Sequence, residues 1–442
     1  MIRLDYKLDV FKLYNVLIDF NPQLLESSFM VKDTGDYSIL CFKPQYSITY
    51  LDGKTSIDYG DRIEIVKEPP LNVLDEIIKG NKGLGTGLVF DGGLVGYLSY
   101  DFGEEIMGIK SKDNSPIKIP SIYFEYFEDF IIVDNRNNIT YVVTDDKDII
   151  NKIKDINYIE PSEDIDVNLK SNFEFEEYCR AVERVREYIR CGDVYQVNIS
   201  HQFYGRGKLN PIYIYSKFRR ANYGPYNALI RVKDKYILST SPEQFLRKRG
   251  DLITTRPIKG TVKKVEDKKE NEKLKRELYE SEKCRSELLM IIDLERNDLS
   301  RICIPGTVRV ESLFDVEEYS TVNHLVSTIQ GKLLKDVGFK EIIEAMFPGG
   351  SITGAPKLRS MEVINEIEKV NRGIYTGSIG YISNNGNMDF NIAIRTAVMD
   401  KENILYNVGG GIVWDSNPED EYEETLHKGR AIYNSLVKGG AR

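Results

Sequence analysis

The first third of the chain alternates short apolar runs with polar turns, a pattern that predicts β-strands. Residues 37–42, 130–133 and 139–143 are rich in β-branched and aromatic side chains, which favour a pleated, half-buried surface. The segment 134–138 (Asp-Asn-Arg-Asn-Asn) separates the last two runs and consists of residues that tolerate tight turns. We therefore predict a hairpin here, within a strand-rich N-terminal region.

The rest of the chain mixes helical and strand patterns. From Glu174, apolar side chains recur at helical spacing until 191–193 (Cys-Gly-Asp) interrupts them, and 194–199 then has the pattern of a strand. The charged segment 268–292 predicts one long helix with a solvated face, and 419–437 predicts a second amphipathic helix. Because strand and helix do not alternate regularly, we expect many antiparallel strands with interspersed helices.

The length of 442 residues is enough for two or three domains. The segment 153–169 is polar, acidic and only weakly periodic, which is typical of a surface crossing between folded parts. We therefore predict a domain boundary there, between regions 1–165 and 166–442.

Composition places the chain among ordinary globular proteins, with 41% hydrophobic and 29% charged residues. A formal net charge of -9 makes the average surface repel nucleic acids and anionic membranes, so we expect neither as a partner. The five cysteines form no CxxC pair, the N-terminus has no signal-peptide pattern, and no apolar run approaches the ~20 residues of a membrane span. These features predict a cytoplasmic protein with reduced thiols.

Lys259 is the most informative single residue. It lies in Arg-Pro-Ile-Lys-Gly-Thr (256–261), directly after a segment with the pattern of a buried strand and turn. Burial disfavours the ammonium form of lysine, lowers the pKa of the amine and makes it a usable nucleophile. An isolated lysine at a turn more often points to solvent, so this hypothesis depends on other residues of the chain.

Acidic residues on two predicted helices suit a hard divalent cation. Glu287 lies late in the long charged helix, and Glu421 and Glu424 share one face of the last helix. Mg²⁺ prefers a few carboxylates together with water and substrate oxygens. Taken alone, however, glutamates on helices mostly face solvent.

Two further residues have acid–base character, and two glycine-rich segments suit an anion. Glu243 follows a strand and a proline, and His324 is one of three histidines. Each can act as an acid or base, or serve as a cap or a structural residue. The segments 349–357 and 407–412 lack the Walker A pattern, but their backbone N–H groups can approach a carboxylate or phosphate closely.

Several motifs, taken in order, resemble the chorismate-utilising enzymes over about residues 173–437. They are 192–197 (Gly-Asp-Val-Tyr-Gln-Val), 241–243 (Ser-Pro-Glu), 257–261 (Pro-Ile-Lys-Gly-Thr), 293–299 (Asp-Leu-Glu-Arg-Asn-Asp-Leu), 324–327 (His-Leu-Val-Ser), 354–357 (Gly-Ala-Pro-Lys) and 409–413 (Gly-Gly-Gly-Ile-Val). The resemblance implies an α+β fold with a core of two packed antiparallel sheets surrounded by helices, as in anthranilate synthase. Region 1–165 is similar to the N-terminal region of that enzyme, and 166–442 would then be the catalytic region.

Two positions separate the reactions within that family. Gln196 stands where isochorismate and salicylate synthases carry a water-activating lysine, which argues against those activities. Lys259 matches aminodeoxychorismate synthases, whereas anthranilate synthases typically have alanine there. The resemblance therefore implies an aminodeoxychorismate synthase large subunit. Anthranilate synthase component I is the alternative.

Roles for individual residues follow from the same resemblance. Lys259 would be the nucleophile, Glu243 the general acid, and His324 a neighbour of the departing hydroxyl. Glu287 and Glu424 would bind Mg²⁺, with Glu421 close by. The residues that would contact chorismate are Tyr375, Arg395, Gly410, Gly411, Thr353 and Gln196.

The resemblance also implies two partners besides chorismate. The chain shows no glutaminase nucleophile elbow with cysteine, so ammonia would come from a separate glutamine amidotransferase subunit. The segment 24–28 (Leu-Leu-Glu-Ser-Ser) resembles the tryptophan-binding segment of anthranilate synthases. Leu25, Glu26 and Ser27 would then form a tryptophan site, regulatory or structural, or simply a strand edge.

Overall fold

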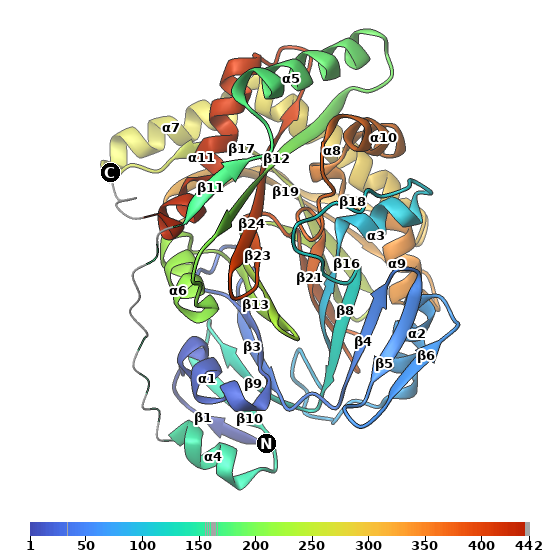
Figure 1. Cartoon of the computed structure of the whole chain (residues 1–442), viewed down its shortest axis with the longest axis vertical. Coiled ribbons are helices and arrows are strands. Elements are labelled where there is room, and N and C mark those ends of the chain that lie inside the picture. The colour runs from blue at the N-terminus through green and yellow to red at the C-terminus, as the bar shows by residue number, and fades with distance from the viewer. Residues whose placement is uncertain are drawn as a thin grey trace.

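The computed structural model describes residues 1–32, 34–154, 156, 158, 160, 165 and 167–437. Its core consists of two large sheets, and every strand pairing in the described part is antiparallel. The predicted α+β class with two packed antiparallel sheets is confirmed. Figure 1 shows the sheets facing each other with helices on the outside.

Sheet I contains the following strands in spatial order: β1 (Ile2–Leu4), β10 (Ile139–Val143), β9 (Asp129–Asp134), β3 (Tyr37–Phe42), β2 (Gln23–Glu26), β13 (Tyr226–Val232), β14 (Lys235–Ser241), β23 (Thr396–Met399), β24 (Asn403–Ile412), β12 (Gln196–Arg206) and β11 (Asn168–Ser171), with β20 (Gly354–Ala355) paired to β12. Sheet II contains β17 (Ile258–Lys263), β19 (Val322–Lys332), β16 (Leu252–Arg256), β15 (Gln244–Arg249), β22 (Met388–Asn391), β21 (Ser378–Ser383), β7 (Gly93–Leu98), β8 (Ile122–Phe127), β4 (Tyr46–Leu51), β5 (Lys54–Asp58) and β6 (Ile63–Val66), with β18 (Arg309–Glu318) paired to β19.

The helices cover the outer faces and the upper end of Figure 1. They are α1 (Val10–Val16), α2 (Pro70–Gly80), α3 (Tyr100–Ile106), α4 (Lys147–Lys154), α5 (Phe175–Arg190), α6 (Pro211–Ala221), α7 (Lys268–Glu280), α8 (Glu282–Ser300), α9 (Phe339–Met346), α10 (Lys357–Ile367) and α11 (Pro418–Leu436), with short 3₁₀ turns η1 (Ile18–Phe20) and η2 (Gly350–Ile352). No helix in the described part of the chain is long and apolar enough to cross a membrane.

Strand β3 shows why the sheets pack face to face. Ile39 and Cys41 belong to the apolar cluster between the two sheets, whereas Leu40 and Phe42 belong to the cluster beneath α1 and α6. Successive side chains of a strand point to opposite faces, so a strand with consecutive apolar residues, such as 39–42 of β3, is buried on both sides. The predicted strand therefore lies at the centre of a layered structure.

The hairpin and the C-terminal helix are found where the sequence predicts them, as β9, β10 and α11. The single long helix over 268–292 is wrong, because the chain breaks at Ser281 into α7 and α8. The extended backbone of Ser281 lets its hydroxyl accept a hydrogen bond from Cys284 N at 3.3 Å, so the serine begins a new helix as its N-cap.

The boundary predicted near residue 165 stays a prediction, because Asp166 and other residues of 153–169 lie outside the described part. Strands from the two sides of that boundary pair in both sheets. In sheet I, β2 pairs with β13, and in sheet II, β7 pairs with β21. The N-terminal strands therefore complete the same sheets that carry the site described next.

Candidate active site

Lys259 and Glu243 meet at a single serine. Lys259 lies in β17, and Glu243 immediately precedes β15 of the same sheet. Ser351 in η2 joins them, because its carbonyl accepts a hydrogen bond from Lys259 Nζ at 3.3 Å and its hydroxyl donates to Glu243 Oε1 at 2.7 Å. The structure thus places an amine and a carboxyl on either side of one residue.

Burial changes the proton affinity of both groups. Desolvation lowers the pKa of the Lys259 amine, and the nearby charge of Glu287 opposes that change. Desolvation raises the pKa of Glu243, against the hydrogen bond from Ser351 and the charge of Lys259. A lowered amine pKa enlarges the neutral, nucleophilic fraction, and a raised carboxyl pKa retains the proton. The pair has the properties of a nucleophile beside a general acid.

A glycine leaves open space beside this amine. An alanine methyl at Gly411 would stand 3.3 Å from Lys259 Nζ and 3.0 Å from Gln196 Nε2. Gln196 is fully buried, and neither polar atom of its amide bonds to any described residue. A buried amide without a partner costs about 1–3 kcal/mol. The amine and the amide therefore face a space suited to a polar ligand.

The glycine strand presents an open edge to the same space. Gly410 and Gly411 pair with β12 on one side. On the other side, β23 pairs with β24 only as far as Tyr406. Among the described residues, no strand pairs with this edge of β24 beyond Tyr406, so backbone N–H groups there can bind an anion such as a carboxylate.

Tyr375 and Arg395 lie at two turns near the glycine strand. The backbone of each turn is left-handed at one residue, Thr376 (φ 63°) in the first and Arg395 itself (φ 51°) in the second. The Tyr375 hydroxyl lies 2.9 Å from where an alanine methyl at Gly409 would stand. The Arg395 guanidinium makes no hydrogen bond or ion pair with the residues that the structure describes, yet its charge lowers the pKa of His324. A guanidinium whose donors have no partner among the described residues is suited to bidentate binding of a carboxylate.

His324 is held as a neutral imidazole. Its Nδ1 shares a hydrogen bond with Thr261 Oγ1 at 2.8 Å, and its ring packs edge-on against Tyr319 with centroids 4.9 Å apart. Burial and the charge of Arg395 lower its pKa to about 3. Nε2 is buried and has no hydrogen-bond partner in the described chain, so it can donate to or accept from a ligand without carrying charge.

The loop that carries Ser351 is fastened to β12. Asn198 N donates to the Thr353 carbonyl at 2.9 Å, and Thr353 Oγ1 donates to Gly349 O at 3.0 Å. Gly354 has φ 142°, and a Cβ there would come within 2.1 Å of Gln196 O, so only glycine allows this contact. Thr353 therefore lies directly beside β12, with its own N–H directed at Gly350 O at 3.4 Å.

The three predicted metal ligands come from α8 and α11. Glu287 and Glu424 both act on the Lys259 amine through their charge. Glu421 is buried, and its Oε1 accepts a hydrogen bond from Ser416 at 2.6 Å. The two helices therefore direct carboxylates toward the amine.

These carboxylates do not form a closed cage. No group of three His, Cys, Asp or Glu side chains able to hold a metal is present among the described residues. The Glu424 side chain is 56% exposed and pairs with Lys428 at 2.6 Å. Mg²⁺ usually takes only one or two carboxylates and completes its shell with water and substrate oxygens, so this donor set is compatible with it.

Comparison with known proteins places the chain in a family. A model of the chorismate binding enzyme family matches residues 26–434. The chain belongs to this family. The residues grouped around Lys259 all lie within the matched segment.

The relatives of this chain include aminodeoxychorismate synthases and anthranilate synthases. The chain is 36% identical to aminodeoxychorismate synthase component 1 of Bacillus subtilis (strain 168), over 91% of the chain and 89% of that protein. It is 38% identical to anthranilate synthase component 1 of Saccharolobus solfataricus, over 84% of the chain and 87% of that protein. The crystal structure of anthranilate synthase component I from Streptococcus pneumoniae TIGR4 superposes with a TM-score of 0.81 at 29% identity, covering 91% of the chain and 93% of that structure.

Sequence reasoning missed two residues of this candidate site. Ser351 lies in the glycine-rich loop, but no pattern marks it as the bridge between Lys259 and Glu243. Lys428 pairs with Glu424 and donates to Gly409 O at 3.2 Å. Its spacing, four residues after Glu424, places it on the same helix face and could have revealed it.

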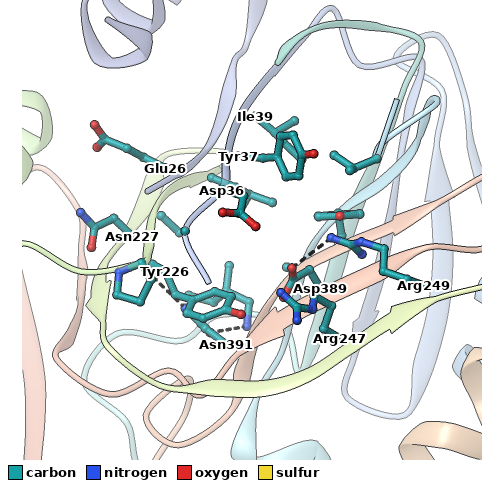
Figure 2. A pocket seen from close by; sticks show the side chains of 18 of the residues that line it. Glu26, Asp36, Tyr37, Ile39, Tyr226, Asn227, Arg247, Arg249, Asp389 and Asn391 are labelled. Atoms are coloured by element: carbon teal, nitrogen blue, oxygen red, sulfur yellow. Dashed lines mark hydrogen bonds and ion pairs between the residues drawn. The ribbon is translucent and has the colours of Figure 1, made fainter. Parts of the chain in front are cut away.

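A cavity of about 420 Å³ opens between the two sheets. Sheet I contributes β2, β3 and β13 to its walls, and sheet II contributes β15, β16, β21 and β22. Figure 2 shows Asp36 and Tyr37 facing Tyr226, Arg247 and Asp389 across the space. Its volume is in the range of small-molecule sites.

Of the three residues predicted to bind tryptophan, Leu25 and Glu26 line this cavity and Ser27 does not. The Glu26 carboxylate accepts hydrogen bonds from Arg219 and from Tyr215 Oη, and in Figure 2 it points away from the cavity. Ser27 Oγ donates to Phe29 O at 3.0 Å. The cavity is also lined by Arg247 and Arg249 of β15 and by Asp389 of β22, which the sequence pattern did not connect with this segment.

Proposed function

We propose that this chorismate-binding enzyme is an aminodeoxychorismate synthase large subunit. The reaction converts chorismate and ammonia to 4-amino-4-deoxychorismate and water, and its product is the precursor of 4-aminobenzoate and folate. The observation that carries the proposal is the amine of the half-buried Lys259, joined through Ser351 to the buried Glu243 carboxyl.

The chemistry follows from these two groups. The neutral Lys259 amine attacks ring C2, both ring double bonds shift by one position, and the C4 hydroxyl departs as water with the proton of Glu243. Ammonia then attacks C4, both ring double bonds shift back, and the bond from C2 to the lysine nitrogen breaks. The proton that ammonia loses goes to the Glu243 carboxylate, so the lysine and the acid are both regenerated.

Substrate binding is assigned to the groups that lack protein partners. Arg395 and Tyr375 take the enolpyruvyl carboxylate, while backbone N–H groups around Gly410 and Gly411 complete the anion site beside Thr353, whose own N–H is directed at Gly350 O. Gln196, whose amide is unsatisfied in the described chain, contacts the ring face beside Lys259. His324 Nε2 orients the departing hydroxyl.

The carboxylates of Glu287 and Glu424, with Glu421 nearby, would hold Mg²⁺. When bound, the cation supplies positive charge for the ring carboxylate of chorismate. Local cations of this kind account for binding of a dianion by a chain whose net charge is -9.

Ammonia requires a source. The relatives named above are called component 1, which supports a second component for this chain as well. We propose that this component is a glutamine amidotransferase subunit, because glutamine hydrolysis supplies ammonia without exposing the site to bulk ammonium.

Anthranilate synthase component I is the second candidate function, favoured by the 38% identity to the Saccharolobus solfataricus enzyme. That reaction needs amination at C2 and loss of pyruvate. A lysine that occupies C2 blocks this route, so Lys259 favours the first candidate.

Product analysis separates the two candidates. The purified chain is incubated with chorismate, Mg²⁺ and an ammonium salt at mildly alkaline pH, with and without a lyase that converts aminodeoxychorismate to 4-aminobenzoate. Formation of 4-aminobenzoate only when the lyase is present supports the proposal. Direct release of fluorescent anthranilate and pyruvate assigns the chain to the second candidate.

The cavity between the sheets is proposed as a tryptophan site, because Leu25 and Glu26 line it and its volume suits one amino acid. Thermal unfolding with L-tryptophan tests this, because a ligand of the native state raises Tm as its concentration passes the Kd. Arg249→Ala, at the cavity wall, should abolish the shift, and an unchanged Tm in the wild-type chain would remove the assignment.

A further inference from the structure

Arg372 is a fully satisfied arginine buried beside the proposed chorismate pocket; only 2% of the residue is exposed. All five of its N–H donors have acceptors. Nε donates to Glu368, Nη1 donates to Ile352 O at 3.1 Å and to Thr376 Oγ1 at 3.2 Å, and Nη2 donates to Asn198 O at 2.7 Å and to Glu368 Oε1 at 2.6 Å. No donor remains for a ligand, so the residue acts on other protein groups.

The acceptors belong to three separate walls of the pocket. Ile352 directly precedes Thr353 in the loop that carries Ser351. Asn198 lies in β12, two residues after Gln196, and Thr376 directly follows Tyr375. One planar guanidinium therefore fixes the spacing between the loop, the strand and the tyrosine turn.

Two further contacts strengthen this arrangement. The guanidinium lies over the ring of Tyr375, 5.7 Å from its centroid, and over the ring of Tyr100, 4.7 Å away. Glu368 balances the charge and also accepts hydrogen bonds from Ser200 N at 2.8 Å and Ser200 Oγ at 3.0 Å in β12. Arg372 and Glu368, which form the ion pair, therefore each make hydrogen bonds to β12.

The tyrosine turn needs such support. Thr376 has φ 63°, a left-handed conformation that is strongly disfavoured for a β-branched residue. Strained conformations persist only where the surroundings over-determine them. The Thr376 hydroxyl accepts from Arg372 and donates to Tyr375 O at 2.5 Å, so the strained residue links the guanidinium to the tyrosine.

We propose that Arg372 is a positioning residue for substrate binding: it holds Tyr375 and the 351–353 loop at fixed distances from β12, so that the pocket is preformed for an anionic ligand. This inference rests on the proposed chorismate site. Lysine cannot replace it, because an ammonium has three donors on a flexible stem and cannot meet five acceptors in one plane.

The test compares Arg372→Lys with Arg219→Lys. Arg219 is a half-buried arginine that, like Arg372, forms an ion pair with a glutamate, here Glu26, but it contacts no residue of the proposed chorismate pocket. Chorismate Kd is measured by calorimetry, KM and kcat by turnover without tryptophan, and folding by circular dichroism and Tm. Because displacements near 1 Å can cost about 10²-fold, we expect Arg372→Lys to raise Kd and KM by about 10- to 100-fold, with a smaller fall in kcat. Arg219→Lys should change Tm alone.

A double-mutant cycle separates positioning from general loosening. If Arg372 acts by placing Tyr375, then Tyr375→Phe should raise Kd clearly in the wild-type background and much less in the Arg372→Lys background. The proposal is overturned if Tyr375→Phe raises Kd by the same factor in both backgrounds. It is also overturned if Arg372→Lys leaves Kd unchanged. Should Arg372→Lys fail to fold, Thr376→Val removes one acceptor while keeping the side-chain shape, and it should raise Kd by a smaller factor; no change in Kd again overturns the proposal.

The outcomes also separate this inference from the proposed function. A wild-type chain that binds chorismate but makes anthranilate refutes the proposed function and leaves the Arg372 test intact. A wild-type chain that does not bind chorismate refutes both. A chain that makes aminodeoxychorismate, with Arg372→Lys binding as tightly as wild type, refutes the Arg372 proposal alone.

Discussion

Replacing Lys259 tests the central step of the proposed reaction. Lys259→Ala removes the amine. Lys259→Arg replaces it with a guanidinium, which stays protonated and positively charged at all working pH values. Since only a neutral amine can attack C2, we expect both variants to lose aminodeoxychorismate formation. In the alanine variant, ammonia can reach C2 directly, so a small amount of anthranilate should appear.

The size of the loss follows from two contributions. A free lysine with a pKa near 10.4 is only about 0.4% neutral at pH 8. Every unit by which burial lowers that pKa raises the neutral fraction about tenfold, until the pKa approaches the pH. A well-oriented group also acts with an effective molarity of about 10⁵ M or more. We therefore expect kcat for aminodeoxychorismate to fall by about 10³-fold or more in both variants.

The assay has a direct chemical readout. Wild-type chain incubated with chorismate and Mg²⁺ but without ammonia should accumulate an adduct whose mass is that of chorismate less one water, and peptide mapping should locate it on Lys259. The product with ammonia is measured by coupling to the lyase. Neither variant should form the adduct.

Lys263→Ala is the matched control, because Lys263 lies in the same strand but is exposed. It should retain both the adduct and the activity. Full aminodeoxychorismate output from Lys259→Ala with ammonia would refute the covalent mechanism, even if the protein otherwise behaved as a synthase.

Three other predictions concern the groups around this amine. Glu243→Gln should lower kcat by about 10²- to 10⁴-fold, whereas Ser351→Ala, which removes only the bridging hydroxyl, should lower it less; equal losses would show that the carboxyl has no proton-transfer role. The pH profile of kcat/KM should be bell-shaped, because the pKa of Lys259 is lowered from 10.5 and that of Glu243 is raised from 4.5: activity rises as the amine loses its proton and falls as the acid loses its own. The two limbs of this pH profile report apparent pKa values that belong to the Lys259–Glu243 pair as a whole. One limb should vanish in Glu243→Gln. Glu424→Gln should shift both the Mg²⁺ titration and the chorismate KM to higher concentration; an unchanged Mg²⁺ titration would exclude Glu424 as a ligand.

Local pattern was a sound guide to individual elements. The β9–β10 hairpin and α11 form where apolar spacing and turn residues predict them, because their structure depends on nearby side chains. The break at Ser281 was missed, since the charged helical pattern continues on both sides of it and the cap depends on one extended backbone conformation.

The sequence by itself determined which residue types are present and, through motif order, the family to which they belong. Only the tertiary structure decided which of them meet. Lys259 and Ser351 are separated by 92 positions, and Ser351 and Glu243 by 108, so no local period relates them. The charged cavity walls in β15 and β22 likewise come from distant segments, as do two of the acceptors of Arg372, the carbonyls of Ile352 and Asn198. Such contacts arise from the order of strands in two sheets, which long-range packing sets and local spacing does not encode.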